Sequence, residues 1–338
     1  MEAPVVSVIV VCHNEEKRIS ACLDSLIGQN FSEPWELIVV NNRSTDTTAE
    51  IVRERMAGCP FMRLLDNDSK TISSGRNLGW HGARADLVAY TDADCIAPPH
   101  WLAMLVAAFR AQKRLDPQLA GVGGGNYQPD DTRFYRALRA FLASPFGNRG
   151  STQTERFESG RYVESLAALN VLYEKAALES VGGYDDELFP FVGEDEDLNT
   201  RLIAAGRGVF YVPDCNVLHF WRDSLRGWFR NMYVYGIGRA RLRRRHPARK
   251  RLTDLLCLAL PAAILLASVS WFAWWLCLPL MGAVAFLMIV SSTAAFGARE
   301  PSLLPLVFLL FFGTFLFYGL GFVKGAVSGR GNVSAGPR

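Results

Sequence analysis

The chain has 338 residues and a formal net charge of +3, so it has room for one large domain or two smaller ones and carries no strong overall charge. Its seven cysteines are odd in number, scattered, and form no C-x-x-C pair, which predicts reduced thiols rather than a disulfide framework. The N-terminus lacks a basic segment and a cleavage site, so we expect no signal peptide and a cytosolic N-terminal part.

Apolar runs and segments of helical periodicity alternate along the first 110 residues. The apolar runs predict strands at residues 6–11, 37–40, 61–65 and 87–90. Helical spacing and helix-start residues predict helices at residues 14–29, 48–56, 73–85 and 101–110. This alternation predicts an α/β fold with a doubly wound, mostly parallel sheet.

The pattern changes near residue 120. A glycine-rich, strand-like segment at 120–127 is followed by a polar and aromatic stretch, 128–165, in which we expect an irregular loop or lid over the substrate site. The rest of the expected domain consists of a strand at 170–173, a helix ending at 181, a helix at 194–205 and a strand at 209–212.

Two aspartates, Asp92 and Asp94, come directly after the apolar run at 87–90. Both carboxylates then lie at the carboxyl edge of a strand, where open α/β sheets bind their ligands. Two hard oxygen donors there suit a divalent cation that also holds phosphate oxygens. The alternative is a solvated, Asp-rich turn before Pro98 and Pro99.

Polar side chains also stand where other strands end and helices begin. His13 and Glu15 follow the first strand, where they could contact a nucleotide, although polar and acidic residues at a helix start give the same pattern. Arg76 follows a Ser-Ser-Gly turn. A guanidinium at a helix start can form an anion site, and the alternative is an ordinary surface arginine. His219 lies close to Trp221 and is either a metal ligand or a structural histidine.

The C-terminal third is apolar and follows a basic run. Eight Lys or Arg residues lie between positions 239 and 251 with no acid among them. Residues 252–296 hold one charged side chain, Asp254, over the length of about two bilayer spans, and residues 302–323 form another stretch of spanning length. Because basic residues beside a span mark the cytoplasmic side, we expect a membrane anchor with its basic end in the cytosol, and no nucleic-acid partner.

Five motifs occur in an order that resembles a known family. They are VIVVCHNE at 8–15, VNNRSTD at 40–46, GRN at 75–77, DAD at 92–94, and GGY at 182–184 with GEDEDL at 193–198. Over residues 5–240 the chain resembles the family 2 glycosyltransferases, whose catalytic domain has the GT-A nucleotide-sugar fold. The resemblance implies an inverting transfer of one sugar from a nucleotide diphosphate sugar.

The resemblance also implies a nucleotide site. His13 and Glu15 are expected beside the base, Arg76 against the nucleotide, and Asp92 on the ribose or in the metal shell. Asn41 stands where the family usually has Asp, whose carboxylate would accept a hydrogen bond from the uracil N–H. The oxygen of the Asn side chain can still accept that bond, so UDP, GDP, dTDP and other donors all stay open.

The same resemblance assigns the metal and the base. Asp94 is expected to bind Mn²⁺ or Mg²⁺ between the two phosphates, with His219 as a further ligand. Asp195 is expected to be the general base for the acceptor hydroxyl, with Glu194 as a second catalytic or acceptor-binding group. The alternative for residues 194–197 is that four acids at a helix start only complement its dipole.

We therefore predict a GT-A domain at residues 1–235, a basic juxtamembrane segment at 236–251, two or three spans at 252–325 and a tail at 326–338. The enzyme would act at the cytosolic face of the inner or plasma membrane on a lipid-linked glycan or lipid acceptor, in cell-envelope glycan synthesis. A processive polysaccharide synthase is an alternative, although no Q-x-x-R-W motif is present. A nucleotide-binding membrane module without catalysis is another.

Overall fold

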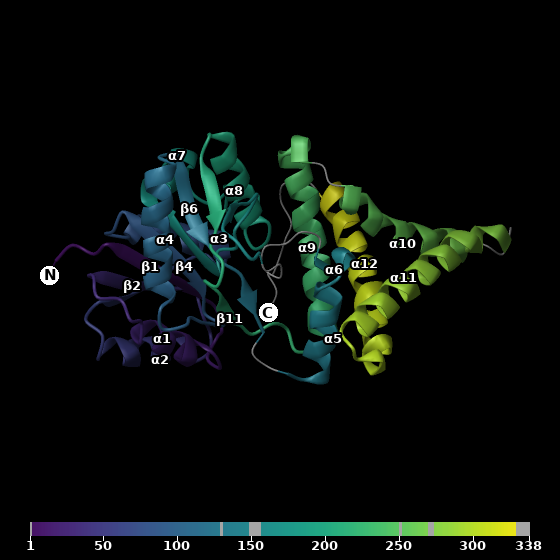
Figure 1. Cartoon of the computed structure of the whole chain (residues 1–338), viewed down its shortest axis with the longest axis horizontal. Helices are drawn as coiled ribbons and strands as arrows, with labels where there is room; N and C mark the ends of the chain where they lie inside the picture. Colours follow the sequence, from purple (N-terminus) through teal and green to yellow (C-terminus); the bar gives the residue numbers. More distant parts are fainter. Residues whose placement is uncertain (1, 129–130, 149–156, 250–251, 270–273, 329–338) are drawn as a thin grey trace. The chain divides into compact units, whose positions relative to one another are not determined.

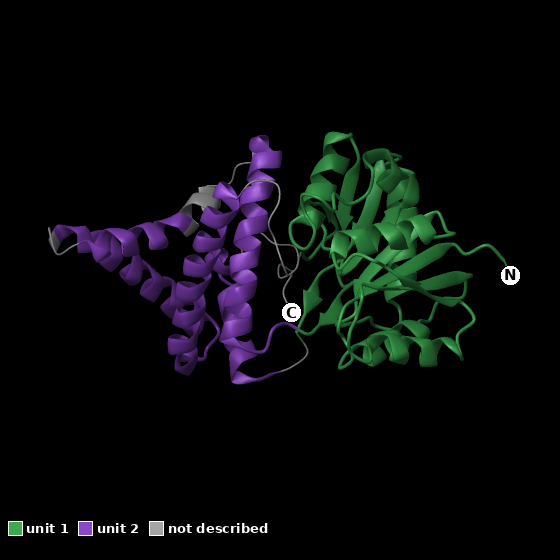
Figure 2. Ribbon diagram, turned by 180° about the vertical axis from the view of Figure 1, so that it is seen from behind, with its two compact units in different colours: residues 1–129, 155–220 green, residues 130–154, 221–338 purple. Residues whose placement is uncertain are grey.

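The computed structural model describes residues 2–128, 131–148, 157–249, 252–269 and 274–328 (Figure 1). The chain forms two compact units, one of residues 1–129 and 155–220 and one of residues 130–154 and 221–338 (Figure 2). All the candidate site residues predicted from the sequence belong to the first unit.

The first unit is built on an eight-stranded sheet with the order β3-β2-β1-β4-β9-β6-β10-β8. Its parallel strands are β1 (Val6–Cys12), β2 (Trp35–Asn41), β3 (Met62–Asp66), β4 (Leu87–Asp92), β6 (Leu119–Gly123) and β10 (Gly208–Tyr211). Two strands run antiparallel, β9 (Asn170–Glu174) between β4 and β6, and β8 (Arg161–Tyr162) beside β10. The expected doubly wound, mostly parallel sheet is confirmed.

Helices cover both faces of this sheet, which is why its inner strands are continuous apolar runs. One face packs against α1 (Ile19–Ile27), α2 (Thr48–Met56) and α4 (Trp101–Leu115). The other packs against α3 (Ile72–Gly82), α7 (Lys175–Val181) and α8 (Glu194–Ala204). The strand ends are therefore the part of the sheet left for polar chemistry.

The first unit also contains a second sheet, which has three strands. It has the order β5-β11-β7, formed by β5 (Cys95–Ile96), β11 (Val217–His219) and β7 (Asn126–Tyr127). In the antiparallel pair of β5 and β11, His219 lies opposite Cys95. This pairing carries His219 to the Asp92–Asp94 turn, although more than 120 residues separate them in the chain.

The second unit is helical. It contains α5 (Arg133–Leu142), α6 (Pro145–Asn148), α9 (Leu225–Arg245), α10 (Leu252–Ser268), α11 (Leu278–Gly297) and α12 (Leu304–Val327), with short 3₁₀ turns at Pro247–Arg249, Trp274–Cys277 and Pro301–Leu303. Helices α9 and α12 approach closely because Gly236 and Gly321 each face the backbone of the other helix. Trp228 of α9 also donates a hydrogen bond to Thr314 of α12 at 2.8 Å.

The expectation of an irregular loop at residues 128–165 is wrong for its middle part. Residues 133–142 form α5, which buries Tyr135, Leu138 and Phe141 in the core of the second unit. The side chain of Thr132 caps this helix by accepting a hydrogen bond from the Tyr135 N–H. Residues 149–156 of the expected loop lie outside the described residues.

Two helical segments of the described chain, 275–297 and 301–327, are long and apolar enough to cross a bilayer. Helix α10, with 17 residues and Pro261 inside it, lies at the short end of the roughly 17–25 residues that a span requires. The basic segment continues α9 through Arg245 into a short 3₁₀ turn. The predicted tail lies beyond the described residues from position 329 onward.

Candidate active site

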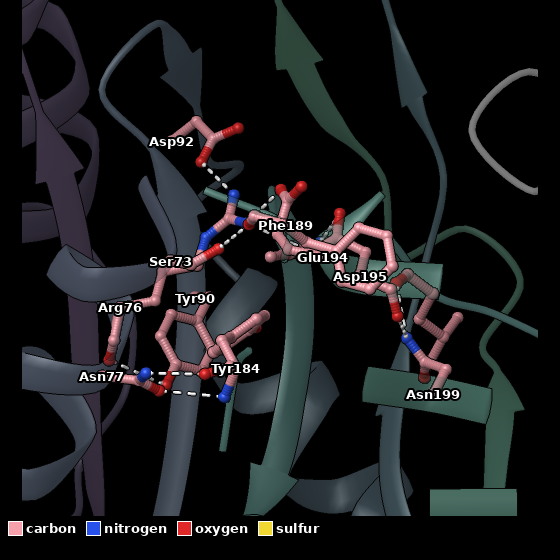
Figure 3. A network of polar contacts seen from close by, with 12 residues as sticks. Ser73, Arg76, Asn77, Tyr90, Asp92, Tyr184, Phe189, Glu194, Asp195 and Asn199 are labelled. Atoms are coloured by element: carbon pink, nitrogen blue, oxygen red, sulfur yellow. Dashed lines mark hydrogen bonds and ion pairs between the residues drawn. The ribbon is translucent and has the colours of Figure 1, made fainter. Parts of the chain in front are cut away.

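Arg76 is the centre of a buried polar network at the carboxyl end of β4 (Figure 3). Its side chain is 3% exposed, and its guanidinium donates to Glu194 at 2.6 Å, Asp195 at 3.2 Å and Asp92 at 3.2 Å. These carboxylates come from β4 and from the start of α8. One cation thus joins the two acidic motifs that the sequence places about 100 residues apart.

Small residues on α3 explain how Arg76 reaches this position. Thr71 caps the helix by accepting a hydrogen bond from the Ser74 N–H. Gly75 and Gly79 face β1 and the end of β2 so closely that a Cβ on either would overlap a neighbouring side chain. Because α3 lies against the sheet, the side chain of Arg76, in its second turn, extends across the end of β4. The guanidinium therefore forms ion pairs with acids, whereas the guanidinium of a surface arginine would be solvated.

Asp195 differs from the other acids at the start of α8. One carboxylate oxygen accepts from Arg76 and the other accepts from the Ala168 N–H at 3.1 Å. Its side chain stays 24% exposed, whereas Glu194 is 8% exposed and Asp197 is fully buried in an ion pair with Arg201. Asp195 is thus a carboxylate that is oriented by the protein and still accessible.

Burial raises the pKa of Asp195 to about 7, against the opposing effect of the Arg76 guanidinium, and the neighbouring charges of Glu194 and Asp92 raise it further. A carboxylate with this pKa is a stronger base than an ordinary aspartate. A large shift of this kind in an accessible acid is typical of a functional site.

The base role expected of Asp195 carries a pH dependence. Only the deprotonated carboxylate can accept a proton, so kcat/KM of a reaction that uses it should rise with pH up to about 7 and then level off. Because the pKa is raised above its ordinary value of 3.8, the stability linked to Asp195 is present below pH 4 and is lost as the pH rises through 7. Transfer rates from pH 5 to 9 with subsaturating donor would measure the rise, and its absence would contradict Asp195 as the base.

Asp94 and His219 form a candidate metal centre. Their nearest atoms, Oδ1 and Nε2, are 3.5 Å apart, and with the Cys95 sulfur the ligand atoms lie within 4.8 Å of one another. Burial, followed by the charges of Asp94 and Asp92, raises the pKa of Cys95, so this thiol is neutral when no metal is bound. The remaining oxygen and nitrogen donors fit Mn²⁺ better than a thiolate-preferring metal.

The residues expected around a nucleotide lie at the ends of β1 and β2. His13 is fixed by a 2.7 Å hydrogen bond between its Nδ1 and the Asn42 carbonyl oxygen. The backbone N–H of Glu15 donates to Thr48 at 2.8 Å, and the Asn14 side chain accepts from the Thr45 N–H. These bonds join the loops that follow β1 and β2. Helix α1 begins four residues later, at Ile19, so Glu15 does not lie in its first turn.

One candidate residue was missed by sequence reasoning. Gln128, directly after β7, is 4% exposed, and neither atom of its amide has a hydrogen-bond partner in the described parts of the chain. Strand β7 pairs with β11 in parallel register, with Tyr127 opposite Leu218, so Gln128 and His219 each come directly after the last paired residue. A lone glutamine after a glycine-rich strand carries no recognisable motif, so only the strand pairing could have identified it.

The chain is similar to proteins of a known family. The model described as glycosyl transferase family 2 matches residues 7–182, which is more than half of the chain. A dolichyl N-acetyl-alpha-D-glucosaminyl phosphate 3-beta-D-2,3-diacetamido-2,3-dideoxy-beta-D-glucuronosyltransferase of Methanococcus voltae is 23% identical over 96% of this chain and 98% of its own. The succinoglycan biosynthesis protein ExoA of Rhizobium meliloti is 28% identical over 79% of each chain.

Solved structures of similar fold include mannosyltransferase PcManGT from Pyrobaculum calidifontis in complex with GDP-Man and Mn²⁺. The TM-score is 0.61 at 18% sequence identity, and the match covers 95% of this chain and 87% of that one. At this identity the similarity shows the fold, which is that of the GT-A glycosyltransferases.

Proposed function

Because the chain belongs to glycosyl transferase family 2, we propose that it is an inverting, metal-dependent enzyme that transfers one sugar to a lipid-linked acceptor. It is a glycosyltransferase that acts on nucleotide sugars.

The observation that carries the proposal is the position of Asp195. Its accessible carboxylate would take the proton of the acceptor hydroxyl, whose oxygen forms a bond to the anomeric carbon of the donor sugar. The bond from that carbon to the diphosphate oxygen breaks, and the nucleoside diphosphate leaves from the opposite face. Arg76 and the Ala168 N–H keep the carboxylate oriented for this step. Glu194, which accepts a hydrogen bond from Arg76 at 2.6 Å, is the neighbouring residue of Asp195.

Asp94 and His219 would hold Mn²⁺ or Mg²⁺. When bound, such an ion neutralises charge on the leaving diphosphate. Asp92 has a separate role in this proposal, because its Oδ1 is bonded to Arg76 and its carboxylate is one-quarter exposed. It would contact the ribose or complete the metal shell, and Arg76 would set its orientation.

Replacement of Asp94 tests the metal assignment. We expect Asp94→Ala to remove most of the effect of Mn²⁺ on donor binding, because Asp94 is the carboxylate that lies beside His219 in the candidate metal centre. Calorimetric titration of a nucleoside diphosphate with and without Mn²⁺ measures this effect. Asp24→Ala, which removes an exposed acid from the middle of α1, is the control and should leave it unchanged. Unaltered metal dependence in Asp94→Ala would reject the site.

The membrane anchor supports a lipid-linked acceptor. Two helical segments could span a bilayer, and α9 ends in Arg243, Arg244 and Arg245, which favour the cytosolic face with its anionic lipids. The Methanococcus voltae relative is by its name a transferase onto dolichyl N-acetylglucosaminyl phosphate. We infer that this chain, too, acts at the cytosolic face on a glycan carried by a polyprenyl or dolichyl phosphate.

A transfer assay tests the whole proposal. Detergent-solubilised protein with Mn²⁺ would be given UDP-, GDP-, dTDP- and CMP-sugars together with a polyprenyl-phosphate-linked sugar or the same sugar without lipid. We expect one sugar to be added to the lipid-linked acceptor, with the anomeric configuration of the donor inverted by NMR. Retained configuration would overturn the inverting mechanism, and transfer to the free sugar alone would overturn the lipid-linked acceptor. A polymeric product would overturn the transfer of a single sugar.

A further inference from the structure

The strand order gives a direction to the nucleotide site. The acids Asp92 and Asp94 lie at and just after the end of β4, and the strands β1, β2 and β3 follow in that order on one side of it. Neighbouring strands are about 4.8 Å apart, so the end of β3 is roughly 14 Å from the end of β4. A nucleoside diphosphate whose phosphates lie at β4 has the length to place its base near the ends of β2 and β3.

Asn41, at the end of β2, is buried and already makes a hydrogen bond through each end of its amide. Its Oδ1 accepts from the Ser44 N–H at 3.0 Å, and its Nδ2 donates to Asp66 Oδ1 at 2.8 Å. The side chain is 7% exposed. The two partners also fix which end of the amide is oxygen, because a carboxylate accepts and a backbone N–H donates. Asn41 therefore serves to orient a neighbour.

That neighbour is Asp66, the last residue of β3, which lies beside Asn41 in the parallel register. Asp66 is exposed, and its second oxygen, Oδ2, has no hydrogen-bond partner among the described residues. The backbone around it is fixed, since the Asn67 N–H donates to the Asn41 carbonyl and the Asn67 side chain donates to Asn42. A carboxylate is thus held at the strand end with acceptor capacity facing solvent.

We propose that Asp66, oriented by Asn41, is the residue that selects the base of the donor nucleotide. Its carboxylate accepts a hydrogen bond from the ring N–H of a keto base, which is N3–H in uracil and thymine and N1–H in guanine. Adenine and cytosine carry a lone pair at the equivalent ring nitrogen, which the carboxylate repels. The inference rests on the proposed function, since it requires a nucleoside diphosphate in this site.

The binding of five nucleotides to the full chain tests this assignment. UDP, GDP, dTDP, CDP and ADP would be titrated calorimetrically in the presence of Mn²⁺ into wild type and Asp66→Asn. The asparagine still accepts the bond from Asn41, so the fold is kept. We expect the wild type to prefer a keto nucleotide, and the variant to lose about 10- to 100-fold in affinity for it, the range of a hydrogen bond to a charged group.

The controls separate the sources of the effect. Asp68→Asn makes the same change at an exposed acid two residues along and should bind as the wild type does. Guanine has an amino group beside its ring N–H. A larger loss of affinity for GDP than for UDP in Asp66→Asn would therefore identify guanine as the base of the donor. Equal affinities for all five nucleotides, or an unchanged preference in Asp66→Asn, would overturn this inference alone. Failure of every nucleotide to bind with Mn²⁺ would overturn the proposed function and this inference with it.

Discussion

Asp195→Asn should lower the rate of sugar transfer by about 10²- to 10⁴-fold, the usual contribution of a positioned general base. The asparagine oxygen can still accept from the Ala168 N–H, so the start of α8 should keep its structure. Binding of the nucleotide donor should change little, because the proton transfer is lost rather than the donor site. Single-turnover transfer together with calorimetric donor binding separates the two effects.

Glu196→Gln is the matched control for this variant. It removes the same charge from the next residue of α8, outside the carboxylates that Arg76 binds, so transfer should stay near the wild-type rate. The residual activity of Asp195→Asn should also lose its rise towards pH 7. Near-normal transfer by a folded Asp195→Asn protein would exclude this residue as the base.

The strands and the polar motifs at their ends could be predicted because both depend on local sequence patterns. The apolar runs that became β1, β2 and β4 are buried on both faces, and burial of that kind leaves a continuous apolar signature. The acids of the Asp92–Asp94 turn and of α8 stand at element ends, where polar residues are easily recognised. Their proximity to one another is a property of the sheet order, which no local pattern encodes.

The contacts made by these residues could not be predicted. The bonds of Arg76 to Glu194 and Asp195 join residues 118 and 119 positions apart, and they depend on two glycines that let α3 lie against the sheet. The pairing of Asn41 with Asp66 depends likewise on the register of β2 and β3. Helix α5 was missed because its apolar residues pack in the second unit, so the flanking polar sequence dominated the pattern.

Arg76→Met should be the most destabilising single change at the site. It leaves Glu194, Asp195 and Asp92 close together without their shared cation, and removal of one partner from a buried ion pair typically costs about 3–5 kcal/mol. Arg76→Lys should recover part of this loss, because it keeps the positive charge. The recovery should be incomplete, since one ammonium cannot reach three carboxylates as the planar guanidinium does. Arg84→Met, at an arginine whose side chain is 57% exposed, is the control for loss of a positive charge.

The pH dependence of the Arg76→Met effect distinguishes electrostatics from packing. The Arg76 guanidinium lowers the pKa of Asp195, so without it this carboxyl takes up a proton more readily, which relieves its repulsion by Glu194 and Asp92. The deficit in unfolding free energy should therefore shrink as the pH falls from 8 towards 5. A packing defect alone would persist unchanged over that range. Denaturant titration of the wild type and the variant at each pH gives the comparison. A constant deficit would mean that Arg76 acts by filling space, and that the orientation of Asp195 depends on the Ala168 N–H instead.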